Sequence, residues 1–356
     1  MDRRHAHRAL PANVRGVSLV DVLVGLTLGL LALLVGYRAF VALDTLRRRA
    51  AEAADADVAA TFALDTLVTQ IGNAGAGWFA AAPWLDSCPV STDVATTLRP
   101  VAVVISDGGA VDRPDTLVIR QAVAPVGSIG AAFAAPAAAG ADFDVEAASG
   151  FEVGHRIVAV SRTGACALAE VTARAYAAPG VLRIAHTPVA TDFPATSVLL
   201  DLGAAGAPSA LRFDVSSGTL RSTDVANGDA PVPLAADVVN LKFQYGIDAD
   251  GDGTLDTWAA AGATGSWSPA ALLAAPRTTL ARITAVRVGL IVRSEERDPA
   301  LRSSYDWVLF DCERDDKSAC PGRLAGTISA TSAGAFRYRA VETVVPLPNV
   351  AWNAGA

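Results

Sequence analysis

The residues Arg15-Gly16-Val17-Ser18-Leu19-Val20-Asp21 lead without a break into the apolar run Val22–Tyr37. Between Val17 and Tyr37 the only charge is that of Asp21. An apolar run of this length is typical of a helix that spans a membrane or fills the centre of a helical assembly. A lone carboxylate in such a helix costs roughly 2.5–3.5 kcal/mol at a bilayer centre, so we expect it to have a cationic partner.

This stretch resembles the class III prepilin signal, the cleavage and methylation segment of type IV pilins and of type II secretion pseudopilins. In those families a prepilin peptidase cuts after the glycine, and the acid beyond the cut pairs with the new terminal amine of a neighbouring subunit. The resemblance implies a leader over residues 1–16, a cut between Gly16 and Val17, and Asp21 as the assembly acid. The family usually has Glu where Asp21 stands and Phe where Val17 stands.

Two other interpretations of the segment stay open. One is an ordinary signal anchor, in which the glycine and the acid have no special role. The other is a secretory signal peptide, which would be cut after its apolar region and not before it.

The chain has 356 residues, enough for one large domain or two, and a formal net charge of −7. The leader carries four arginines against one aspartate, so its removal leaves a more acidic body. An acidic body is a poor electrostatic match for nucleic acid, which argues against a DNA-uptake receptor. Arginines also follow the apolar run, at Arg38 and at 47–49, so charge does not set its orientation. The leader pattern and the cysteines favour a body outside the cytoplasm.

The four cysteines are Cys88, Cys166, Cys312 and Cys320. In an exported protein an even number favours disulfides. Cys312 and Cys320 flank a short polar loop and are expected to pair, which leaves Cys88 with Cys166 by elimination. The alternative is four free thiols in a cytosolic protein. A metal site at the cysteines is not favoured, because no histidines cluster with them.

The pattern predicts one long helix within residues 17–75. Residues 17–43 are apolar on all sides and form the anchor, in which Gly25 and Gly29 have the spacing that lets two helices approach closely. Residues 44–71 are amphipathic, and their apolar side chains recur at helical spacing, at Leu64, Leu67, Val68 and Ile71. That stripe is expected to pack on a sheet. The glycine-rich residues 72–77 end the helix and do not form a dinucleotide loop, because they follow a helix and not a strand.

Residues 76–356 read as short β-strands separated by Gly, Pro, Asp and Ser, with a loop or insertion near Ala122–Ala141 and a hairpin turn at Ser216–Gly218. We expect an antiparallel β-rich body of either one domain or two subdomains, and two subdomains would divide near residues 210–240. Three segments resemble, in order, strands of the PilW-like minor pilins: Val238–Asp248, Ala285–Ser294 and Tyr338–Asn349.

Alternating carboxylates mark the segment Asp248–Asp256. Asp248, Asp250, Asp252, Thr254 and Asp256 occupy the first, third, fifth, seventh and ninth positions of a calcium loop, with a glycine at the sixth. The twelfth position is Ala259, so the bidentate Glu of an EF-hand is missing. We expect either a weak structural calcium site or a solvated acidic turn without metal.

No pattern indicates catalysis. His155 and His186 lie in or beside strand-like runs, and no nucleophile elbow, zinc-protease motif or phosphate loop is present. We expect no enzyme and no certain cofactor beyond the possible calcium.

The sequence therefore predicts an α+β, type IV pilin-like fold, with a long N-terminal helix packed on an antiparallel β-rich body. The resemblance implies a minor pilin that primes pilus assembly or sits at the filament tip. Its partners would be other minor pilins, the major pilin and the prepilin peptidase, and it would be held in the inner membrane by one span with its body in the periplasm. One alternative is a type II secretion pseudopilin of the J type, which shares leader and body plan. Another is a membrane-anchored periplasmic enzyme or binding module.

Overall fold

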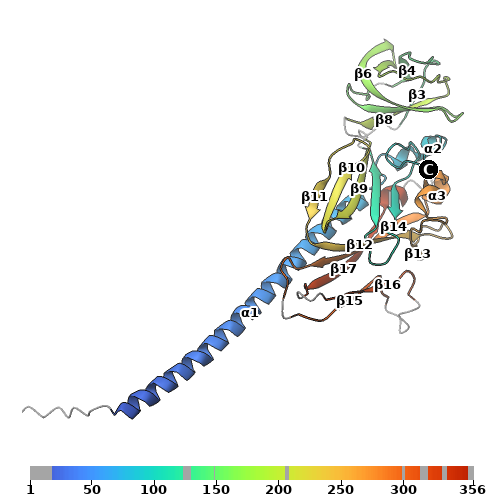
Figure 1. The fold of residues 1–356 in the computed structure, drawn as a ribbon. Helices are drawn as coiled ribbons and strands as arrows, with labels where there is room; N and C mark the ends of the chain where they lie inside the picture. The colour runs from blue at the N-terminus through green and yellow to red at the C-terminus, as the bar shows by residue number, and fades with distance from the viewer. Residues whose placement is uncertain are drawn as a thin grey trace, which may run out of the picture. The chain divides into compact units, whose positions relative to one another are not determined.

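The computed structural model describes residues 18–122, 130–147, 149–204, 208–298, 301–312, 320–330 and 335–351. The chain divides into two compact units, Met1–Ala53 and Ala54–Ala356. Figure 1 shows the ribbon. The predicted cut between Gly16 and Val17 lies outside the described residues.

A single helix, α1, begins at Leu19 and ends at Gly72. In the first unit every residue from Ser18 to Leu43 is exposed. Leu19–Asp44 is the one segment, among the residues that the structure describes, with the length and composition of a membrane span. The predicted apolar half of the helix is therefore present, and none of the described residues covers it.

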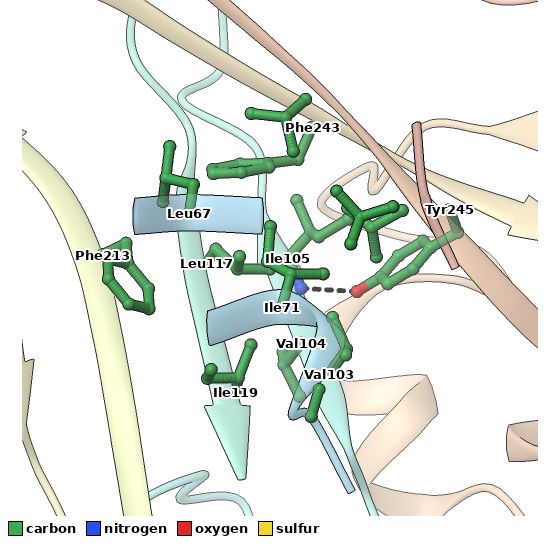
Figure 2. Packing of buried hydrophobic residues seen from close by; sticks show 14 of the residues in the cluster. Leu67, Ile71, Val103, Val104, Ile105, Leu117, Ile119, Phe213, Phe243 and Tyr245 are labelled. Carbon is green, nitrogen blue, oxygen red and sulfur yellow. Dashed lines mark hydrogen bonds between the residues drawn. The ribbon is translucent and has the colours of Figure 1, made fainter. Parts of the chain in front are cut away.

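In the second unit α1 buries one stripe of side chains against the sheets. Leu67 and Ile71 are fully buried, and Leu64 and Val68 pack against the same cluster, as the spacing predicted. Figure 2 shows Leu67 and Ile71 among side chains of the surrounding strands, with the Tyr245 hydroxyl accepting a hydrogen bond from the backbone N–H of Ile105. Along this stripe three small residues come first and two large ones follow (Ala56, Ala60, Ala63, Leu67, Ile71), and the small residues let the helix lie close to its neighbours.

Two antiparallel sheets surround this core. The five-stranded sheet has the order β1-β2-β9-β10-β11, and the four-stranded sheet has the order β13-β12-β14-β17. The strands of the first are β1 (Val103–Ser106), β2 (Thr116–Gln121), β9 (Ser209–Ser216), β10 (Thr219–Asp224) and β11 (Val232–Ala235). Those of the second are β12 (Val238–Ile247), β13 (Thr257–Ala259), β14 (Ile283–Arg293) and β17 (Tyr338–Pro346). The hairpin of β15 (Tyr305–Leu309) and β16 (Leu324–Ile328) forms a separate two-stranded sheet.

A six-stranded sheet lies between β2 and β9 in the sequence. Its order is β3-β8-β5-β6-β7-β4, and an isolated bridge between Phe133 and Val145 joins the two ends of that order. The strands are β3 (Ala131–Ala132), β4 (Phe143–Glu146), β5 (Arg156–Val160), β6 (Cys166–Ala178), β7 (Val181–His186) and β8 (Val198–Gly203). They enclose their own apolar cluster, in which Phe133, Phe143 and Phe193 contact one another. We call residues 131–203 the inserted barrel.

The expected division of the body near residues 210–240 is not the one that the structure shows. The part with its own sheet and core is the inserted barrel, residues 131–203. A boundary there would cut the sheet that β9, β10 and β11 share with β1 and β2. The chain instead leaves the five-stranded sheet after Gln121 and returns at Ser209, and these two residues are paired across β2 and β9. The predicted turn at Ser216–Gly218 is present, with positive φ angles of 51° at Ser217 and 76° at Gly218.

Short helices complete the body: η1 (Phe79–Ala81), α2 (Ala82–Leu85), α3 (Pro269–Ala274), α4 (Arg277–Leu280) and α5 (Pro348–Ala351). The last of them holds the end of α1, because the Asn349 side-chain amide donates to the carbonyls of Gly72 and Ala74, each at 3.3 Å. These carbonyls stand at or just beyond the helix end, where backbone acceptors lack helical partners. Helix α5 is therefore held against the end of the long helix.

Candidate functional site

The first candidate site is the start of α1. The Ser18 backbone N–H donates to Asp21 Oδ2 at 3.3 Å, and Ser18 Oγ accepts from the N–H of Val20 at 3.3 Å. Ser18 and Asp21 thus form a reciprocal pair at the helix N-terminus, where backbone donors lack helical partners. Both residues are exposed, so the Asp21 carboxylate is accessible to a partner.

The small-residue positions of the apolar half lie open. A Cβ added at Gly25 or Gly29 would meet no atom within 4 Å. Both glycines therefore leave room for another helix, as their spacing predicted.

Both predicted disulfides are present. Cys88 pairs with Cys166, and Cys312 pairs with Cys320. The first bond joins the segment after α2 to β6 of the inserted barrel. The second closes a short loop after β15, as expected from the spacing of the two cysteines.

The acidic loop between β12 and β13 gathers three of the five predicted ligand residues. Asp248, Asp250 and Asp256 each offer a carboxylate oxygen, and these oxygens lie within 4.8 Å of one another. Asp248 is buried, and its carboxylate accepts hydrogen bonds from Gly251 and Gly253 at 2.6 and 2.8 Å. This wraps the loop tightly around the first acid.

The other two predicted ligands contact each other. Asp252 Oδ1 accepts from both the backbone N–H and the hydroxyl of Thr254, at 2.7 and 2.6 Å. These hydrogen bonds lower the pKa of the Asp252 carboxyl below its ordinary value. The donor set of carboxylate oxygens suits calcium, which stays a prediction for this loop.

Both histidines of the body have structural contacts. His155 Nδ1 lies 3.0 Å from both carboxylate oxygens of Asp201, which also accepts from the N–H of Phe151. The His186 ring stacks on Phe143 with centroids 3.8 Å apart. Both rings therefore have partners within the inserted barrel.

Sequence reasoning missed the buried cations Arg99, Arg120, Lys242 and Arg287, of which Arg120 and Lys242 are the most deeply buried. The Arg120 guanidinium lies over the Trp78 ring, 4.4 Å from its centroid, and donates to the carbonyl of Val94. Burial lowers the pKa of Arg120 to about 10, although the carboxylates of Asp224 and Asp93 oppose the shift. An arginine at the end of a strand pattern gives no signal that its side chain points inward.

The other most deeply buried cation is Lys242, whose Nζ lies 2.8 Å from Asp115 Oδ1 and also donates to the Ala110 carbonyl. Burial raises the pKa of the Asp115 carboxyl, although hydrogen bonds from Lys242, Gly108 and Phe243 favour its charged form. The pair fixes the loop between β1 and β2 against β12.

Comparison with protein families adds an independent observation. Residues 205–349 match the family model described as Type IV Pilus-assembly protein W, PilW. Over these residues the chain is similar to the PilW family of type IV pilus-assembly proteins. The PilW match begins just before β9 and ends within α5, so it covers the four-stranded sheet and the β15–β16 hairpin. It includes the three segments in which the resemblance was seen, and it leaves out α1 and the inserted barrel.

Comparison with solved structures finds a type IV-like pilin from Thermus thermophilus. It is 14% identical to the PilW-like chain, and the match covers 56% of this chain and 86% of the other. The TM-score of 0.20 is too low to carry a structural argument. A search of curated proteins found no match.

Proposed function

We propose that this chain is a minor pilin, a structural subunit that primes assembly of the type IV pilus or sits at its tip. The single observation that carries the proposal is the exposed apolar segment Leu19–Asp44 with one acid at its head, on a chain whose body matches PilW. Neither feature serves catalysis, and both suit a subunit that moves between a membrane and a helical assembly.

In this proposal a prepilin peptidase removes residues 1–16 and leaves Val17 as the mature N-terminus. The subunit waits in the inner membrane with its body in the periplasm, where the two disulfides form and persist. It then joins other minor pilins and the major pilin through helix packing.

Asp21 supplies specificity in this scheme. A carboxylate in a membrane interior is unfavourable by roughly 2.5–3.5 kcal/mol at the centre, and a neighbour's terminal ammonium relieves that cost. The subunit therefore gains stability when a correctly placed partner arrives. The shorter Asp requires that partner to come closer than a Glu would.

The first test is mass spectrometry of the mature protein. A chain that begins at Val17, with a methylated amine, supports the proposal. A chain that keeps residues 1–16 contradicts it, and so does one cut after the apolar segment.

The second test compares three strains: one with the gene deleted, one with Asp21→Asn and one with Asp21→Glu. We expect loss of surface pili in the first two and retained pili in the third, because Glu keeps the charge at this position. An unchanged pilus count after deletion, with secretion of exported proteins reduced, would instead identify a type II secretion pseudopilin. Full activity of a soluble fragment without the anchor would point to a membrane-anchored enzyme or binding module.

A further inference from the structure

A cavity of about 150 Å³ lies between strands of the inserted barrel and of the five-stranded sheet. Arg156 of β5 and Leu168 of β6 line it from the barrel, and Arg120 of β2 lines it from the sheet. We call this space the two-arginine cavity. A cavity of about this volume accepts a molecule the size of benzene, so a small ligand fits it.

Arg120 brings a buried positive charge to the cavity. The residue is 2% exposed, and its guanidinium lies over the Trp78 ring and donates through Nη1 to the carbonyl of Val94. Its Nε is also buried, and none of the described residues accepts a hydrogen bond from that nitrogen. A buried donor on a cation is costly when it has no acceptor. The guanidinium therefore has hydrogen-bonding capacity that the protein does not use.

Two acids act on Arg120 but are held by their own loops. Asp224 and Asp93 favour the charged form of Arg120, yet burial still lowers its pKa to about 10. The Asp224 carboxylate accepts from the side-chain amide of Asn227 at 2.8 Å, and the Asp93 carboxylate accepts from the N–H of Ala95 at 2.9 Å. Arg120 is still a cation at neutral pH, and a carboxylate in the cavity would compensate its charge more directly.

Arg156 brings a second guanidinium to the same space. Its side chain is 36% exposed, and its Nε lies 3.7 Å from Glu170 Oε2, which is too far for a hydrogen bond. Nε has no acceptor among the residues that the structure describes. Two cations on one cavity wall favour an anion between them. Planar guanidinium groups match a carboxylate best, because each can donate two parallel hydrogen bonds to it.

The apolar part of the wall favours an organic anion over an inorganic one. Leu168 is 41% exposed, and Leu98 and Pro208 add further apolar surface to the cavity. Apolar side chains gain free energy when a hydrocarbon chain replaces the water beside them. Sulfate and phosphate have no such chain. The small volume limits the ligand to a short one.

We propose that the two-arginine cavity binds a short-chain organic carboxylate, with its carboxylate between Arg120 and Arg156 and its hydrocarbon chain against Leu168. Such a ligand would contact both the inserted barrel and the five-stranded sheet, so its binding would stabilise the folded body. The inference goes beyond the role proposed above and does not depend on it, because the site lies wholly within the body.

Isothermal titration calorimetry of the full-length protein in detergent tests the ligand class. The probes are butyrate, butyramide and sulfate at constant ionic strength. Butyrate and butyramide have the same number of non-hydrogen atoms, and only butyrate carries a charge. We expect saturable binding of butyrate, with a Kd about tenfold lower than that of either control, because butyramide loses the charge-assisted hydrogen bonds and sulfate loses the apolar contacts. Equal binding of butyramide or of sulfate would overturn the assignment to carboxylates.

Two arginine variants test the location. Arg156→Gln should raise the Kd for butyrate about tenfold, because one charged donor is lost. The matched control is Arg174→Gln: Arg174 also lies on the inserted barrel, its side chain is 35% exposed, and it pairs with a glutamate, Glu152, but it does not line the cavity. We expect the control to bind butyrate as the wild type does. Unchanged affinity in Arg156→Gln, or an equal loss in the control, would overturn the proposed site.

The buried cation is tested by Arg120→Met. We expect this variant to show no binding of butyrate, because it lacks the deepest donor group of the cavity. Its melting temperature without ligand shows whether it folds, and if it does not, the comparison of Arg156→Gln with Arg174→Gln decides the proposal. A folded Arg120→Met protein that binds butyrate with wild-type affinity would overturn it.

Discussion

The disulfide between Cys88 and Cys166 should contribute more to the stability of the body than the disulfide between Cys312 and Cys320. The cysteines of the first bond are separated by 78 residues in sequence, and those of the second by 8. A cross-link restricts the unfolded chain by an amount that grows with the logarithm of the loop length. That relation gives about 4.5 kcal/mol for the longer loop and about 2.5 kcal/mol for the shorter one.

The surroundings of the first bond add to this difference. Cys88 is buried in a cluster that joins Trp78 and Leu85 to Val158 and Leu200 on two strands of the inserted barrel. The bond therefore crosses the contact between the barrel and the segment that follows α1. Without it, the barrel keeps the β2–β9 connection and this packing but loses its covalent link.

The assay is urea unfolding of the full-length protein in detergent, followed by tryptophan fluorescence. The buried Trp78 lies in the cluster beside Cys88 and reports on it directly. We expect the double variant Cys88→Ala, Cys166→Ala to lose about 2 kcal/mol more of its unfolding free energy than Cys312→Ala, Cys320→Ala. An equal loss in both, or a larger loss in the second, would refute the reasoning from loop length and packing.

Three further predictions concern the body. Calcium should raise the melting temperature of the wild-type protein and not that of Asp250→Ala, because the variant lacks one of the three converging carboxylates. Equal effects of calcium on the calorimetric scans of the two proteins would contradict a calcium site in this loop. Tyr245→Phe should lower the free energy of unfolding in urea by about 1–3 kcal/mol, because the buried N–H of Ile105 loses its acceptor. A loss below about 0.5 kcal/mol would show that this N–H finds another partner. Lys242→Met should cost about 3–5 kcal/mol in urea unfolding, and adding Asp115→Leu should recover much of that loss; a double variant no more stable than Lys242→Met would contradict it.

Asp115 also makes a pH-dependent contribution with a defined sign. Burial raises its pKa in the folded protein above the unfolded value, so the folded state binds more protons in the window between the two. Stability from this group is present below the unfolded pKa and is lost as the pH rises through the folded pKa. Between pH 4 and 7, Asp115→Asn should lose less stability than the wild type as the pH rises; parallel pH profiles of melting temperature would contradict this.

The sequence predicted the helix, its two halves, the disulfides and the frame of the body. Each of these features can be recognised from a short stretch of sequence or from a count of residues. The apolar run of about twenty residues and the helical spacing of residues such as Leu67 and Ile71 indicate the two halves of the helix, and the even number of cysteines indicates disulfides. The predicted helix, Val17 to about Ile71, differs from the observed Leu19–Gly72 only at its ends. The expected cleavage site and the role in pilus assembly came only from the resemblance to the prepilin signal. No physical pattern within residues 15–21 by itself indicates a peptidase.

The inserted barrel could not be predicted as a unit, because its strands β3, β4 and β6 carry weak local signals. Strand β6 (Cys166–Ala178) contains six alanines, and alanine favours a helix in isolation. Its pairing with β5 and β7 is what makes it a strand, and register shifts occur at two places along its pairing with β7. Strand β3 has two residues and lies in the segment that reads as a loop. The burial of Arg120 and Lys242 was missed for a related reason. The residues that they contact are remote in sequence, so no local pattern marks them.

The position of the barrel explains why sequence comparison matches only the later part of the body. Strands β2 and β9 are neighbours in the five-stranded sheet, yet the whole barrel separates them in sequence. Closing a flexible loop of that length would cost several kcal/mol of chain entropy, about (3/2)RT ln n. An insert that folds by itself, with its first strand β3 paired to its last strand β8, lowers that cost. The five-stranded sheet can therefore keep its β2–β9 pairing although a long segment separates the two strands in sequence. Strands β1 and β2 lie before that segment, and the PilW match, residues 205–349, lies after it.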